Sequence, residues 1–381
     1  MYLDRLIRFF SSLRLTVVCL ALGMIIIFAG TFAQVELGLY KAQNEFFRSF
    51  LVYWTPHGTS WKIPVLPGGY LVGGVLLINL VSAHFSRFRF SQKKVGIWMI
   101  HAGLILMLLG QLLTDMLSNE STMHLREGEA KNYSESDRVA ELVVADTSDA
   151  DSDTVAAINQ SALSRRSEFT IPGLPLTIRV RHYFMNSTVA NRGADAAEPA
   201  AATQNIGARA VVKELPRVTA MDQRDVPSAV VEVMTPQGSL GTWLVSEYID
   251  RPQTFVWNNR TYEIALRSER HYKPYTVQLL NFTHDLYKGT DIPKNFASRV
   301  LLQRPDTGER REARIYMNNP LRYAGETYYQ ASYDKDDHGS VFQVVRNPSW
   351  LTPYLSCVLV GLGLIIQFMS HLVPFVRRSP A

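Results

Sequence analysis

The stretch VGIWMIHAGLILMLLG, residues 95–110, decides the architecture of this chain. It belongs to a longer run, 95–114, that contains no Asp, Glu, Lys or Arg, and the runs 15–35, 63–86 and 347–376 share this property. Because about 20 consecutive apolar residues span the hydrocarbon core of a bilayer, each run is long enough to cross it. The sequence therefore predicts an α-helical integral membrane protein with four transmembrane helices.

The segment between the third and fourth runs has an ordinary polar composition and the length of a large domain. Short stretches in it alternate apolar and polar residues between Gly, Pro and Asn, which is typical of β-strands. These stretches are Arg138–Val144, Leu176–Val180, Ala229–Met234, Thr261–Leu266 and Tyr275–Leu280. We expect a large, mainly β, extracytoplasmic domain, with flexible exposed loops at about 146–166 and 186–207, where Ala, Asp, Ser and Asn dominate.

Basic residues near the helix ends predict the orientation of the chain. Nine basic residues and one acidic residue, Asp4, lie on one side of a four-pass arrangement. The nine are Arg5, Arg8, Arg14, Arg87, Arg89, Lys93, Lys94, Arg377 and Arg378. Both termini are therefore expected in the cytoplasm. The rest of the chain carries 30 basic and 33 acidic residues, so the formal net charge of +5 reflects orientation and does not indicate nucleic-acid binding.

These patterns divide the chain into nine expected segments. They are a cytoplasmic N-terminus 1–14, helix 15–35, a periplasmic loop 36–62, helix 63–83, a basic cytoplasmic loop 84–94, helix 95–115, the periplasmic β-rich domain 116–349, helix 350–373 and a cytoplasmic tail 374–381.

The sequence contains none of the common hydrolase or nucleotide-binding signatures. It has no Gly-rich phosphate loop, no His-Glu-x-x-His zinc motif and no Gly-x-Ser-x-Gly elbow. Its two cysteines, Cys19 and Cys357, both fall inside apolar runs, so the β-rich domain has no disulfide or thiolate metal site. We therefore predict no catalytic residue, and the sequence favours a binding or handling role.

His101 is the strongest candidate for a functional residue, because an ionisable side chain inside a membrane helix is costly and usually functional. It follows Lys94 by seven residues, roughly 10 Å along a helix. A neutral imidazole at this depth can be an axial haem ligand or a proton carrier. It can also simply hydrogen-bond a neighbouring helix, since Ala102, Gly103 and Gly110 indicate a helix-packing face. The two interpretations are compatible.

The other histidines give weaker signals. His84 and His371 lie near the cytoplasmic ends of the second and fourth expected helices, where both can extend to the interface. Outside the apolar runs, His124 and His284 occur in the segments with the most distinctive sequence.

Six motifs together resemble the ResB (CcsB-type) family of cytochrome c biogenesis proteins. They are SLRLT (12–16), IHAGL (100–104), STMHLREGE (121–129), LLNFTHDLYKGTDIPKNFAS (279–298), MNNPLRYAGETYYQASY (317–333) and NPSWLTPY (347–354). The resemblance runs nearly end to end and is weakest between about 145 and 260. The six tryptophans are scattered and form no haem-presenting segment, so the chain resembles the ResB half of the system and not a fusion with its partner.

The resemblance implies a subunit of the membrane cytochrome c synthase, itself non-catalytic or co-catalytic. Its implied partners are a CcsA-type (ResC) haem-handling membrane protein, apocytochrome c and, indirectly, a thioredoxin-like reductant, in a bacterial inner membrane. The implied cofactor is haem b in transit, with His101 as an axial ligand shared with the partner, and His371 is a further candidate. We expect no second ligand within this chain at the depth of His101.

The motif at residues 317–333 has two interpretations. Asn319, Pro320, Arg322 and Tyr323 either form a turn before a strand, or dock apocytochrome c or the partner. Two other functions stay open for the whole chain. One is a purely structural scaffold without haem ligation. The other is a b-type electron-transfer protein, which needs two facing in-chain histidines, and we expect His84 and His371 to lie too near the interface for this.

Overall fold

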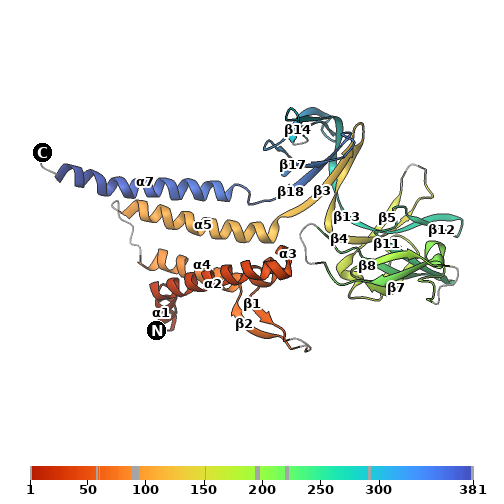
Figure 1. Ribbon diagram of the computed structural model, residues 1–381, viewed down its shortest axis with the longest axis horizontal. Helices are drawn as coiled ribbons and strands as arrows, with labels where there is room; N and C mark the ends of the chain where they lie inside the picture. The colour runs from red at the N-terminus through yellow and green to blue at the C-terminus, as the bar shows by residue number, and fades with distance from the viewer. Residues whose placement is uncertain are drawn as a thin grey trace. The chain divides into compact units, whose positions relative to one another are not determined.

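The structure, a computed structural model, describes residues 2–56, 59, 61–87, 94–150, 152–193, 198–218, 223–290 and 293–378 (Figure 1). They form two compact units. The described residues of the helical unit run up to residue 119 and resume at residue 346, and those of the β unit lie between residues 120 and 345. Arg89, Lys93 and the end of the predicted tail, 379–381, lie outside the described residues.

The helical unit contains long helices joined by short elements. Its elements are α1 (Tyr2–Phe10), α2 (Leu13–Leu37), α3 (Leu39–Ala42), the π-helix η1 (Gln43–Phe47), β1 (Leu51–Trp54), β2 (Ile63–Pro67), α4 (Gly69–Arg87), α5 (Val95–Leu117) and α7 (Thr352–Arg378). Within the described ranges, four helices are long and apolar enough to cross a membrane: Leu13–Leu37, Gly69–Ser86, Val95–Leu117 and Thr352–Val376. The chain is a multi-pass membrane protein, as predicted.

The second membrane helix begins later than the sequence predicted. We expected it from residue 63, but Ile63–Pro67 forms strand β2, which pairs with β1, and α4 starts at Gly69. Pro64 and Pro67 explain the difference, because proline has no backbone N–H to donate and pushes the preceding residue out of the helical region. Part of the charge-free run therefore continues the preceding loop.

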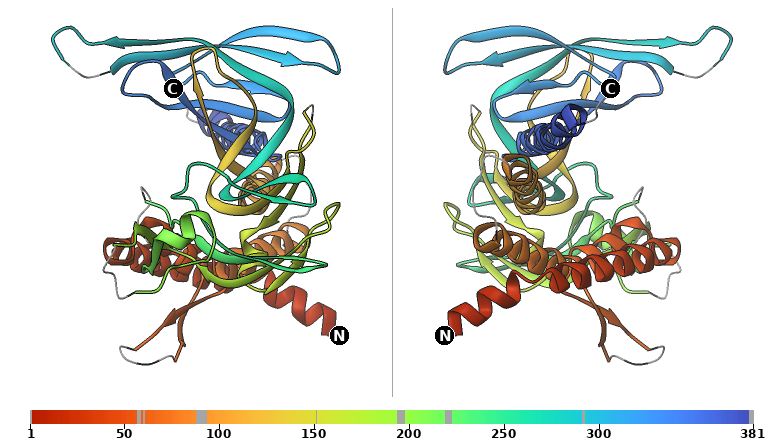
Figure 2. Two further views of the ribbon diagram at one scale, coloured as in Figure 1. Left: turned by 90° about the vertical axis from the view of Figure 1, so that its right-hand side faces the viewer. Right: turned by 90° about the vertical axis from the view of Figure 1, so that its left-hand side faces the viewer.

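Three glycines on α5 bring this helix close to α7, and the two helices run side by side in Figures 1 and 2. A Cβ atom at Gly96 would lie 2.7 Å from the carbonyl oxygen of Gly363, and one at Gly103 would lie 2.9 Å from that of Ser356. At Gly110 it would lie 2.2 Å from the Thr352 hydroxyl. Small residues permit this backbone approach. The helix-packing face predicted from Gly103 and Gly110 is confirmed.

A buried polar side chain fixes the start of α2. The Asn79 amide on α4 donates to the carbonyl of Phe10 at 2.5 Å and to that of Ser12 at 3.1 Å, and its oxygen accepts from the Thr16 hydroxyl at 2.6 Å. Backbone groups at a helix break inside a bilayer must find such partners. Asn79 supplies them where α1 ends and α2 begins.

The β unit consists of strands and two short helical segments. They are β3 (Asn119–Arg126), β4 (Ala130–Asp146), β5 (Thr154–Asn159), α6 (Gln160–Leu163), β6 (Glu168–Thr170), β7 (Thr177–Phe184), β8 (Ser187–Asn191), η3 (Asn205–Arg209), β9 (Ala210–Glu214), β10 (Ser228–Thr235), β11 (Gly238–Ser246), β12 (Gln253–Trp257), β13 (Arg260–Leu286), β14 (Pro293–Arg304), β15 (Glu309–Tyr316), β16 (Leu321–Tyr323), β17 (Glu326–Tyr333) and β18 (Gly339–Arg346). This mainly β unit between the third and fourth membrane helices confirms the predicted fold class.

The strands are antiparallel and form one large sheet and three smaller ones. The ten-stranded sheet has the order β15-β14-β13-β4-β3-β18-β17-β16, with β12 also paired to β13 and β5 to β4. A four-stranded sheet has the order β11-β10-β7-β6, and the pairs β8-β9 and β1-β2 stand apart.

Strand β13 contributes to both of the larger hydrophobic cores of the β unit. Its first half places Tyr262 and Ile264 in a core with β4, β7, β10 and β11. Its second half places Tyr275, Val277 and Leu279 in a core with β3, β14, β15, β17 and β18. Each set alternates with outward residues, as the period of two requires.

The two stretches for which we expected flexible loops contain regular structure. Residues 154–159 form β5, which pairs with β4, and residues 187–191 form β8, which pairs with β9. Small residues such as Ala156 and Ala157 on β5 are paired with β4 through backbone hydrogen bonds. Amino-acid composition alone does not reveal such pairing.

Candidate functional site

Three aromatic side chains form a cluster between α4 and α5. The ring centroid of His84, on α4, lies 3.9 Å from that of Trp98 and 6.3 Å from that of His101, both on α5. His84 is 3% exposed, and His101 is half-buried. The cluster lies wholly within the helical unit.

The geometry of α5 explains why Trp98 and His101 meet His84. Residues three apart on a helix share a face, so Trp98 and His101 point the same way. His101 and Gly103 are two residues apart, about 200° around the helix. The glycine face therefore packs on α7 while the opposite face presents His101 toward α4.

A backbone contact sets the protonation pattern of His101. Its Nδ1 lies 2.8 Å from the carbonyl oxygen of Ile97. A carbonyl oxygen only accepts, so Nδ1 must donate, and in the neutral imidazole the lone pair then lies on Nε2. This is the tautomer in which Nε2 can bind a metal.

One expectation about these histidines was wrong. We expected His84 to lie near the interface, but Trp98 covers its ring and α4 packs against α5, so the side chain is buried. We also expected no second haem ligand in this chain at the depth of His101; the ring of His84 lies 6.3 Å from that of His101, and its role as a ligand stays a prediction. His371, in contrast, is exposed on α7, where its Nε2 lies 2.8 Å from the Gln367 side-chain nitrogen, one turn away on the same helix.

Sequence reasoning missed Trp98 and gave His84 only a weak signal, although a stronger signal for His84 existed. In a helical hairpin, residues at similar distances from the connecting loop lie beside each other. His84 precedes the end of α4 by three residues, and His101 follows the start of α5 by six. Counting from the helix ends, and not from the ends of the charge-free runs, would have placed them at neighbouring levels.

The donor set of this cluster suits an iron porphyrin. The porphyrin itself supplies four nitrogens, so a haem iron takes one or two axial ligands from protein, commonly imidazole. The described residues contain no group of three or more His, Cys, Asp and Glu side chains placed to hold a metal ion. Two neighbouring imidazoles are the type of donor that haem iron takes from protein.

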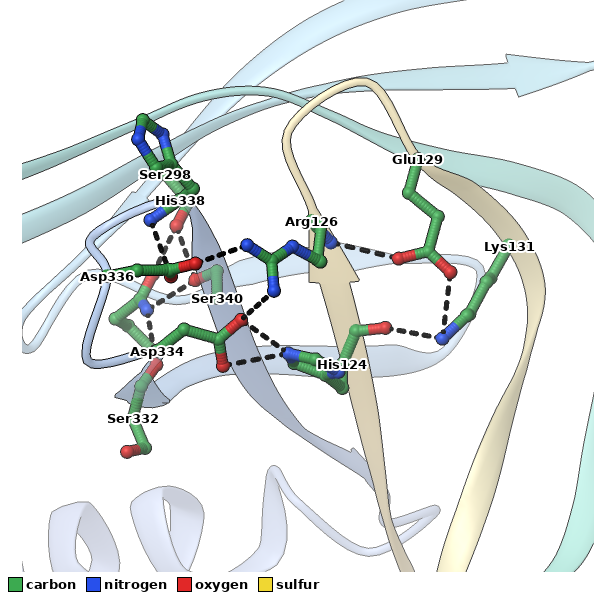
Figure 3. A network of polar contacts seen from close by, with 11 residues as sticks. His124, Arg126, Glu129, Lys131, Ser298, Ser332, Asp334, Asp336, His338 and Ser340 are labelled. Carbon is green, nitrogen blue, oxygen red and sulfur yellow. Dashed lines mark hydrogen bonds and ion pairs between the residues drawn. The ribbon is translucent and has the colours of Figure 1, made fainter. Parts of the chain in front are cut away.

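The β unit carries a second set of histidines around the turn between β17 and β18 (Figure 3). His124 Nε2 lies 2.9 Å from the Asp334 carboxylate, and Arg126 forms ion pairs with Asp334 and Asp336. The Asp336 pKa is held below its ordinary value by the hydrogen bond from Arg126. These contacts attach the turn to strand β3.

A buried ion pair involves the motif at residues 317–333. Lys273 Nζ is 2.7 Å from the Glu326 carboxylate, which also accepts from the hydroxyls of Tyr275 at 2.8 Å and Tyr328 at 3.0 Å. Burial alone would raise the pKa of Glu326, but the bonds from Lys273 and the tyrosines hold it below its ordinary value. Tyr328 is fully buried, so this part of the motif is architectural.

The predicted docking residues occupy a turn and a short strand. Asn319 bridges to Tyr316 through two backbone hydrogen bonds, and Pro320 leads into β16. Tyr323 donates to Glu309 at 2.7 Å. Asn319 and Arg322 are exposed, so the turn interpretation holds while a docking role stays a prediction.

Two comparisons with known proteins bear on the function. Residues 238–341 match the family described as the ResB-like family. The chain is also 23% identical over 301 residues to Protein NrfI of Wolinella succinogenes. That alignment covers 78% of this chain and 30% of NrfI, so the chain spans less than a third of the length of this relative.

Proposed function

We propose that this chain is a ResB-type protein and that it serves cytochrome c maturation by holding haem between α4 and α5 for transfer outward. The ResB-like match supports a role in cytochrome c maturation. The observation that carries the haem part is the pair of imidazoles, His84 and His101, with ring centroids 6.3 Å apart inside the membrane helices.

His101 is the axial ligand in this proposal. Its Nδ1–H is held by the Ile97 carbonyl, which fixes the ring and leaves the lone pair on Nε2. Such a hydrogen bond on the other nitrogen orients metal-binding histidines. When bound, haem supplies the group that becomes joined to the cytochrome, and this chain's residues position it.

The α5–α7 contact keeps His101 in place. The glycine face leaves α5 little freedom to rotate, because Gly96 and Gly103 already touch the α7 backbone. Trp98 packs on His84 and excludes water from that side. Positioning of this kind is what thioether formation requires, because ferrous haem and two thiols must be held in register.

The partner, the substrate and the reductant in this proposal come from the resemblance to the ResB family. The partner is a CcsA-type membrane protein that shares the haem b, the substrate is apocytochrome c, and a thioredoxin-like protein keeps its thiols reduced. The β unit is periplasmic and both termini are cytoplasmic, which the distribution of basic residues supports. Asn319 and Arg322 are exposed positions at which the β unit docks one of these partners.

A second candidate is a b-type arrangement in which both axial ligands come from this chain. In this candidate His84 and His101 would together hold one haem iron, since haem iron takes one or two imidazole ligands from protein. Their ring centroids lie 6.3 Å apart, with the rings inclined by 34°. A second imidazole so close to His101 favours this candidate over its standing from sequence alone.

Maturation of a reporter c-type cytochrome tests the proposal. In cells that depend on this chain and a CcsA-type partner, His101→Ala should abolish covalent haem attachment, and added imidazole should restore part of it. His371→Ala is the matched membrane-histidine control and should leave attachment intact. Full maturation in the His101→Ala strain would refute the haem-ligand role.

A separate variant tests docking. Asn319→Ala/Arg322→Ala should reduce maturation while the haem spectrum of the complex stays unchanged, because these side chains lie in the β unit. Unimpaired maturation would leave the motif with an architectural role only.

A further inference from the structure

His284, on strand β13, differs from the other histidines that contact the β17–β18 turn. His124 and His338 are exposed at this turn, whereas the His284 side chain is only 10% exposed. Its Nε2 is buried and has no hydrogen-bond partner among the residues that the structure describes. A buried polar atom without a partner is uncommon and calls for an explanation.

The other ring nitrogen of His284 is held by a carboxylate. Nδ1 lies 3.1 Å from Asp337 Oδ1. An ionised carboxylate only accepts, so Nδ1 carries the proton and the lone pair of the neutral ring lies on the buried Nε2. Asp337 itself has a left-handed backbone, with φ of 58°, in the tight turn closed by its N–H to the Asp334 carbonyl. A carboxylate behind an imidazole is the usual device that orients a metal-binding histidine.

Aromatic rings cluster beside the His284 ring. The Tyr333 centroid lies 4.5 Å from that of His284 and 5.5 Å from that of Phe282, on which it stacks. Phe296, directly opposite His284 in the β13–β14 pairing, lies 5.4 Å from Tyr333. Flat apolar molecules bind well against such rings.

We propose that His284 is an axial ligand for haem iron in the β unit, oriented by Asp337 and flanked by Phe282, Phe296 and Tyr333. This site is separate from the cluster between α4 and α5, and its ligand identity rests on the proposed function in haem handling. One histidine suffices because the porphyrin provides the other in-plane donors. Ligation would require the rings around the buried Nε2 to move, and Tyr333 and Phe296 are only half-buried.

The test uses the full chain in detergent with both imidazoles of the α4–α5 cluster removed. In the His84→Ala/His101→Ala protein, titration with haemin should give a saturable shift of the Soret band. His284→Ala should abolish that shift, and free imidazole should restore it. Asp337→Asn, which removes only the orienting carboxylate, should weaken haemin binding about 10- to 100-fold.

Two further variants make the result decisive. His338→Ala is the matched control, because His338 lies in the same turn and contacts the carboxylate of Glu127 but is exposed, and it should bind haemin like the parent. If His284→Ala fails to fold, His284→Met keeps a ligand of similar size and should bind with a shifted band. An unchanged band in the His284→Ala protein, or no saturable band in the parent, overturns the proposal. Neither result bears on His101, which maturation assays test independently.

Discussion

Replacing Lys273 by Met should destabilise the β unit strongly, because it leaves a carboxylate buried without its cation. Lys273 is 3% exposed at its side chain and Glu326 is 16% exposed. Breaking one side of a buried ion pair typically reduces stability by about 3–5 kcal/mol. Two tyrosine hydroxyls continue to bond Glu326, so we expect the lower end, about 3 kcal/mol. For a unit of more than 200 residues this lowers Tm by roughly 6–12 °C.

Thermal unfolding of the detergent-solubilised chain, followed by β-sheet circular dichroism, measures this effect. Arg304→Met is the matched control: its ion pair with Asp306 is similarly short, at 2.9 Å, but exposed. Exposed pairs are worth about 0–1 kcal/mol. The double variant Lys273→Met/Glu326→Gln should lose less than the sum of its single variants. Equal small losses in the Lys273 and Arg304 variants would refute the buried-pair reasoning.

Three other variants test separate parts of the structure. Gly103→Ala should cost about 1–3 kcal/mol by overpacking the α5–α7 contact, whereas Gly361→Ala, with open space around it, should be neutral in the same melting assay. Folding lowers the pKa of Glu326, so the stabilisation from this carboxylate is fully present above its unfolded pKa, about 4.3, and is lost as pH falls through its folded pKa. Glu326→Gln should therefore reduce the dependence of the unfolding free energy on pH in this acid range. An unchanged acid-unfolding profile would contradict this. Asn79→Leu should expose the α1–α2 junction to limited proteolysis, because the Phe10 carbonyl loses the Asn79 donor and the Ser12 carbonyl keeps only its bonds from Thr16; equal protease resistance would argue against it.

The sequence predicted the membrane helices well because the length of a charge-free apolar run can be compared directly with the thickness of the bilayer core. It placed strands correctly wherever apolar residues alternate, but it split β13 into two strands. The interval between them carries Arg267 and Arg270, which resemble loop residues. In the structure they pair across to β4, with Glu141 at 2.9 Å and Glu135 at 3.0 Å, and the strand continues through them.

The candidate site was only half predictable. His101 stands out in sequence because it interrupts an apolar run. His84 does not, since its burial depends on Trp98, a residue on another helix. The buried Nε2 of His284 likewise depends on Asp337, more than fifty residues away, and on rings from three strands. Such tertiary contacts leave no periodic signal in the chain.

The haem spectrum of this protein purified with a CcsA-type partner tests the central claim most directly. The account predicts a b-type spectrum in the wild type, its loss in His101→Ala, and its recovery when imidazole is added. Parallel His84→Ala samples show whether the second ligand belongs to this chain or to the partner. An unchanged spectrum in both variants would contradict the account and assign haem binding in the membrane to the partner alone.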